Sequence, residues 1–138
     1  ANPSLGGTAE VLYECPAYDP ALTDAQQVGP RMMDNLTVIM GEVIIQEDPG
    51  NNAYLAGIWQ YDIARDTMRR VYAHDAARFT PGSPGFVTQD EESSGIIPAF
   101  DLIGPRTYLA VTQVHKASAD PELVEGGQLV AIRIPPSP

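Results

Sequence analysis

The sequence predicts an all-β protein, and three observations support this fold class. Short runs of apolar and β-branched residues recur along the chain, each bounded by turn-forming residues. Glycine and proline number 12 and 13 of 138 residues, which is typical of many short strands joined by turns. Helical patterns are confined to residues 19–27 and 118–123, and both are too short to organise a domain. A chain of this length forms one domain.

The first half of the chain predicts one strand and then a complete sheet. Residues 9–15 (AEVLYEC) have the composition of an isolated strand. Four further strands are expected close together, with tight turns between them, at residues 36–40, 42–46, 56–63 and 68–73. Their spacing predicts a four-stranded antiparallel meander.

The second half repeats this rhythm with one strand fewer. Three strands are expected at residues 94–100, 107–114 and 128–134, the last after a turn at Gly126 and Gly127. Repeated four-stranded meanders are the mark of β-propeller blades, so these sheets are expected to be the last blades of a propeller. A small β-sandwich is the alternative.

This pattern divides the single region 1–138 into three parts. Residues 1–30 form an irregular segment with one strand. Residues 31–76 form a complete blade, and residues 86–135 form a final, incomplete blade.

Charge and cysteine content exclude several classes of function. The chain carries 18 acidic and 8 basic residues, a formal net charge of -10, whereas nucleic-acid binders need a basic face. No apolar run approaches the roughly 20 residues of a membrane span. Cys15 is the single cysteine, which excludes an internal disulfide and a multi-cysteine zinc site. We expect it to be a buried or partly buried free thiol.

The segment QEDPGNN at residues 46–52 is the first candidate site. Glu47, Asp48, Asn51 and Asn52 offer side-chain oxygens, the ligands that calcium prefers. The spacing is not that of an EF-hand loop. An ordinary polar hairpin loop is the alternative.

The consecutive acids Asp90, Glu91 and Glu92 form the second candidate site. Adjacent carboxylates repel each other unless a cation or hydrogen-bond donors hold them, although a solvated acidic turn would also tolerate them. Equivalent strand ends of successive blades meet at one rim. Because neighbours on a strand point to opposite faces, we expect Glu91 or Glu92 to share a rim with Glu47 and Asp48.

The two histidines and the aromatic residues of one strand are further candidates for chemistry or packing. His74 and His115 lie near strand ends and could ligate a transition metal, but two surface histidines are the simpler interpretation. Trp59 and Tyr61 lie on one face of their strand and are expected in the core.

Five segments of the chain together resemble the PhoX-type bacterial alkaline phosphatase family. They are residues 33–38 (MDNLTV), 43–52 (VIIQEDPGNN), 57–62 (GIWQYD), 89–97 (QDEESSGII) and 123–129 (LVEGGQL). The resemblance implies a six-bladed propeller, periplasmic or secreted, that hydrolyses phosphate esters with calcium and iron. Since family members are several hundred residues long, it also implies that this chain is the C-terminal portion of such an enzyme.

The resemblance places seven residues at the functional rim. Metal ligation is expected first of Glu47, Asp48, Glu91 and Glu92, with Asp34, Asn35 and Asp90 as weaker candidates. A second hypothesis is a non-catalytic extracellular β-domain used for binding or as a scaffold. Exposed sheet edges would then recruit a partner chain or a second copy, over residues 107–114 or the outer strands.

Overall fold

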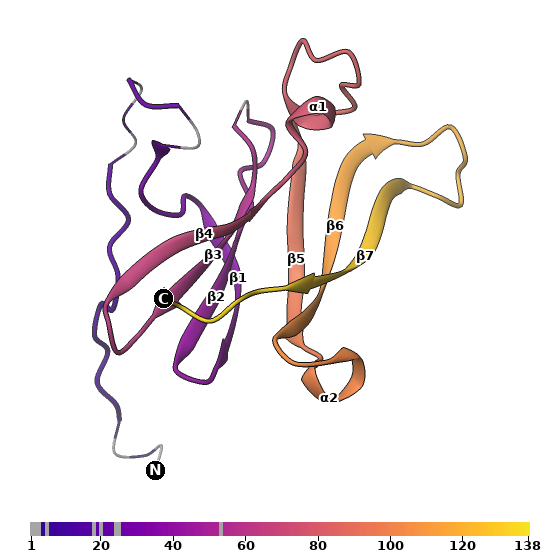
Figure 1. Cartoon of the computed structure of the whole chain (residues 1–138). Coiled ribbons are helices and arrows are strands. Elements are labelled where there is room, and N and C mark those ends of the chain that lie inside the picture. Colours follow the sequence, from indigo (N-terminus) through magenta and orange to yellow (C-terminus); the bar gives the residue numbers. More distant parts are fainter. Residues whose placement is uncertain (1–3, 5, 18, 20, 24–25, 53) are drawn as a thin grey trace.

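A computed structural model describes residues 4, 6–17, 19, 21–23, 26–52 and 54–138, and it confirms the all-β prediction (Figure 1). Two antiparallel sheets follow each other along the chain. Sheet A has the order β1 (Met33–Ile39), β2 (Glu42–Glu47), β3 (Gly57–Asp62) and β4 (Thr67–Ala73). Sheet B has the order β5 (Glu91–Pro98), β6 (Thr107–Ala117) and β7 (Glu125–Arg133).

The main core lies between the two sheets. Ile44 and Ile58 of sheet A pack against Tyr108 and Ala110 of sheet B, and all four are almost fully buried. These residues alternate with side chains on the opposite face, as the period of two along a strand requires. β1 lies next to β5, so the first strands of the two sheets are neighbours.

A second cluster covers the outer face of sheet A, where Val43, Ile45, Trp59 and Tyr61 are buried together. This confirms the predicted core positions of Trp59 and Tyr61. Tyr13 from the N-terminal segment packs on Tyr61, with ring centroids 5.8 Å apart.

The predicted strand at residues 9–15 is wrong. These residues contact sheet A through the Tyr13 ring and the Leu12 carbonyl, which lies 2.9 Å from Tyr61 Oη, and the structure assigns them no strand. Strand-like composition produces a strand only where a neighbouring backbone supplies ladder hydrogen bonds, and no described strand lies beside this segment.

Several boundaries in sheet B also differ from prediction. β5 begins at Glu91, because β6 is long enough to pair Val114 with it, so Glu91 and Glu92 lie in a strand and not in a turn. Gly126 and Gly127 likewise lie within β7, opposite Val114 and Gln113. The turn that joins β6 to β7 occupies residues 118–124, where a helix was expected over 118–123.

Helices are short throughout the described residues. The other predicted helix, at residues 19–27, includes positions outside the described residues; of the described ones, Ala21 lies in a turn and Gln26 in a 3-10 helix, and none lies in an α-helix. Two single-turn helices were not predicted: α1 (Ala76–Phe79), capped by the Asp75 carboxylate, and α2 (Phe100–Ile103). None of the described helices has the length and apolar character needed to cross a membrane.

The C-terminal tail fastens sheet B to sheet A. Arg69 donates to the carbonyls of Pro135 and Pro136 at 2.7 and 2.9 Å. Arg106 donates to the Ile134 carbonyl at 2.8 Å and forms an ion pair with Glu42 at 2.6 Å. These contacts and the shared core fix the ends of the two sheets relative to each other.

Candidate functional site

The structure sorts the four principal candidate acids into two groups. Glu47 and Glu91 are each 1% exposed. Glu47 accepts a hydrogen bond from the backbone N–H of Gly57, and Glu91 accepts one from the backbone N–H of the preceding residue, Ala56. The carboxyl groups of Asp48 and Glu92, one residue further along, lie close enough to interact electrostatically between the two sheets. Because alternation turns successive side chains to opposite faces, the acids do not converge as a single set of four.

Glu47 is fully occupied by protein donors. One oxygen accepts from the Arg31 backbone N–H and the other from the Gly57 backbone N–H, both at 2.7 Å. Burial raises the pKa of Glu47, while these bonds and the nearby Arg70 charge act in the opposite direction. A Cβ added at Gly57 would lie 2.6 Å from Arg70 Nε, so a glycine is needed at this close approach.

Glu91 and His74 form a buried contact between the sheets. Glu91 Oε1 accepts from the Ala56 backbone N–H at 3.1 Å and lies 3.7 Å from His74 Nδ1. Burial, followed by the Arg70 charge, lowers the pKa of His74 to about 4, so this histidine is neutral at pH 7. The expectation that both histidines lie at the surface is therefore wrong for His74, whose ring packs against Phe79.

Asp48 and Glu92 form the acidic rim, together with Asp34. Burial, then the hydrogen bond to Asp48, then the Asp48 charge raise the pKa of Glu92 to about 7, and Asp34 adds a smaller effect. His115 lies 4.0 Å from Glu92 and opposes the shift. Near neutral pH, Glu92 is therefore only partly ionised.

The three weaker candidates differ in position. Asn35 donates to Asp34 and, at 3.3 Å, to Ser94 Oγ of β5, which ties the first strands of the two sheets together. The Asp90 carbonyl accepts from the His115 backbone N–H at 2.9 Å. Asp34 thus adds to the rim and Asn35 bonds to it, whereas the bond at Asp90 engages only its backbone carbonyl.

The donor chemistry decides which metals fit. Asp34, Asp48 and Glu92 present the hard oxygen atoms that suit calcium, whereas Glu47 and Glu91 are used by the fold. Across the described residues, no group of three or more His, Cys, Asp or Glu side chains could hold a metal ion. Burial and the Glu47 charge raise the pKa of the partly buried Cys15, which favours a protonated thiol over an iron ligand.

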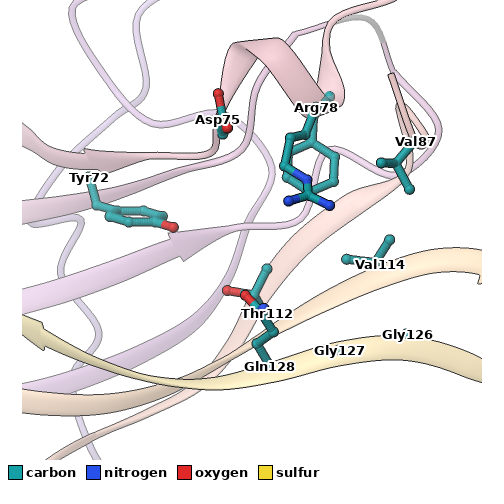
Figure 2. A pocket seen from close by; sticks show the side chains of 10 residues that line it. Tyr72, Asp75, Arg78, Val87, Thr112, Val114, Gly126, Gly127 and Gln128 are labelled. Atoms are coloured by element: carbon teal, nitrogen blue, oxygen red, sulfur yellow. The ribbon is translucent and has the colours of Figure 1, made fainter. Parts of the chain in front are cut away.

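A cavity that the sequence did not predict lies between the sheets (Figure 2). It has a volume of about 410 Å³ and is bounded by β4, α1, β6 and β7. Phe79, Val87 and Val114 form apolar walls, and Thr112 and Gln128 are polar neighbours across the strand pair. The Gly126–Gly127 pair is the feature of the sequence that could have predicted this cavity, because glycines within a strand leave the space that side chains would otherwise fill.

Comparison with known family models, curated proteins and solved structures finds no match to this chain. Its function is therefore inferred from its own residues and from the sequence resemblance described above.

The rim predicts how stability responds to pH. Because the pKa of Glu92 is raised above its unfolded value, its contribution is fully present below about pH 4.5 and is lost as pH rises through about 7. Without calcium, Glu92→Gln should therefore gain stability relative to the parent protein between pH 5 and pH 8. Urea unfolding at both pH values measures this difference.

Comparing Glu92→Gln with the parent protein separates the pH dependence due to Glu92 from that of the other titrating groups. His74 acts with the opposite sign, since its lowered pKa removes stability as pH falls below its ordinary value, but it is present in both proteins. An equal stability difference at pH 5 and pH 8 would contradict the raised pKa of Glu92.

Proposed function

We propose that this chain forms the last two blades of a calcium-dependent β-propeller that hydrolyses phosphate esters, as the C-terminal part of a PhoX-type enzyme. The observation that carries the proposal is the contact between Asp48 and Glu92. It joins the ends of two successive sheets, within two of the segments on which the resemblance is based. The same resemblance favours a periplasmic or secreted protein.

The outer faces of both sheets favour a propeller over a two-layer sandwich. On sheet A, Leu36 and Val38 are exposed beside the buried Ile45 and Val43. On sheet B, Val111 and Leu129 are cross-strand partners and are both exposed. Additional blades stacked on either side would cover these faces, whereas the outer faces of a sandwich are ordinarily polar.

Asp48 and Glu92, with Asp34 nearby, would supply part of the calcium ligands, and the remaining oxygen ligands would come from other blades. When bound, calcium supplies Lewis-acid chemistry, which stabilises negative charge on phosphate oxygens. The fold orients Asp48 through the Gly50 backbone N–H, which donates to its Oδ1 at 2.9 Å. Asn35 holds β1 against β5, which keeps the Asp34 side of the rim in place. Among the described residues, no group of three or more His, Cys, Asp or Glu side chains could hold iron.

Calcium should stabilise the chain through the rim. We expect millimolar calcium at pH 8 to raise the melting temperature, because Glu92 is mostly ionised at this pH and the ion relieves its repulsion with Asp48. The shift should be smaller at pH 5.5, where Glu92 is protonated. The paired substitution Asp48→Asn with Glu92→Gln should abolish most of it. Differential scanning calorimetry with and without calcium makes the measurement.

Exposed acids in the β6–β7 turn supply the matched control. Asp120→Asn with Glu122→Gln removes the same charge but should leave the calcium shift unchanged. A shift that survives the rim substitutions and disappears in this control would place calcium elsewhere.

Catalysis is tested in a protein that carries this chain together with its remaining blades. Hydrolysis of 4-nitrophenyl phosphate should require calcium and should fall at least tenfold with the rim substitutions, as expected for a lost ligand. Hydrolysis that is indifferent to calcium would contradict the proposed chemistry.

A binding or scaffolding domain is the second candidate. The exposed apolar residues Leu36, Val38, Val111 and Leu129 favour it, because contiguous apolar surface marks interaction sites. In that case calcium would stabilise the rim without any accompanying hydrolysis.

A further inference from the structure

β7 presents an unpaired edge at the end of sheet B. Among the described strands it pairs with β6 alone, whereas sheet A has a fourth strand (Figure 1). β7 is nine residues long, and most of its residues are exposed. The N–H and C=O groups along such an edge are ready to pair with another strand.

The sequence of β7 is electrostatically self-complementary. Leu129 is its central residue, with Glu125 four positions before it and Arg133 four positions after it. Strand alternation places these three side chains on one face. If two copies of β7 pair antiparallel about Leu129, Glu125 of each copy lies opposite Arg133 of the other.

We propose that β7 is the two-fold interface of a homodimer, in which the two copies of sheet B join edge to edge into one continuous six-stranded sheet. Two ion pairs flank the dimer axis, and the two Leu129 side chains meet on it. Opposite charges directly across a strand pair stabilise it, and like charges destabilise it. This charge pattern selects a second copy as the occupant of the edge.

The apolar surface supports the same partner. Leu129 is 73% exposed and lies beside Val111, which is 37% exposed, so pairing covers an apolar strip as well as the backbone edge. His115 Nδ1 lies 2.8 Å from Glu125 Oε2 and holds that carboxylate near the end of the strand. The Glu125 side chain is still 46% exposed and accessible to a partner's arginine. The proposal depends on neither calcium nor hydrolysis.

Charge reversal provides the test, with mass measured by light scattering over a range of concentrations. The 138-residue chain should form a dimer that dissociates on dilution. Arg133→Glu places two acids opposite each other at both ends and should weaken the dimer roughly tenfold or more. Glu125→Arg should weaken it similarly by placing arginines opposite each other.

Mixing the two single variants gives the decisive result. In a mixed pair every acid again faces an arginine, so a heterodimer should form where neither variant dimerises alone. The double variant, with both charges exchanged within one chain, should also recover the homodimer. Leu36→Lys on the outer face of sheet A is the control and should leave dimerisation unchanged.

Any of four outcomes would overturn the proposal. A chain that stays monomeric at high concentration has no such interface. A dimer that is unaffected by charge reversal, or one that Leu36→Lys disrupts, uses another surface. Failure of the mixed variants to associate would show that residues 125 and 133 do not face each other.

Discussion

Replacing Glu47 by alanine is expected to destabilise the protein by about 3 kcal/mol, the largest effect expected of any candidate metal ligand. The substitution removes the acceptor for the Arg31 and Gly57 backbone N–H groups, and the Gly57 group is buried. A buried donor left without its acceptor costs about 1–3 kcal/mol, and loss of the carboxylate beside Arg70 adds to this cost. Urea unfolding measures the change.

Two controls separate this structural role from calcium binding. Asp48→Ala, at the next position, should cost only about 1 kcal/mol because Asp48 is partly exposed. The cost of Glu47→Ala should also be the same with calcium as with a chelator. If Glu47→Ala were harmless, or if its cost appeared only with calcium, Glu47 would be acting as a ligand.

Replacing Ile44 by alanine is expected to cost about 2–5 kcal/mol. Ile44 is fully buried, and its side chain packs with Ile58 and Tyr108 where the two sheets meet. Truncation leaves a cavity in the layer that fixes sheet A against sheet B. The same change should weaken the calcium response, because Asp48 and Glu92 reach each other only while the sheets are correctly packed.

The exposed Ile97 supplies a control of the same residue type. It is 56% exposed on β5, so Ile97→Ala should change stability by only about 0.5 kcal/mol. Similar losses at both positions would mean that the interface between the sheets is not the main source of stability.

The order of the strands followed from local sequence. The short apolar runs of β2 and β3 and the turn between β1 and β2 predict an antiparallel meander, and the structure has one. Residues 9–15 have an equally strand-like composition but do not form a strand. A ladder needs a partner, and the presence of a partner is not a local property.

That neighbouring acids on a strand point to opposite faces follows from the sequence alone, since alternation is built into the backbone of a strand. The sequence could not determine which acids stay at the rim. Glu47 is not available as a metal ligand, because the backbone N–H of Gly57, ten residues along the chain, donates a hydrogen bond to it. Glu91 is not available because the backbone N–H of Ala56, which precedes β3, donates a hydrogen bond to it. Asp48 and Glu92 meet, and the pKa of Glu92 rises to about 7, only because sheet packing brings two distant strand ends together. Burial and hydrogen bonding depend on the whole fold, so the role of each carboxylate was decided by the tertiary structure.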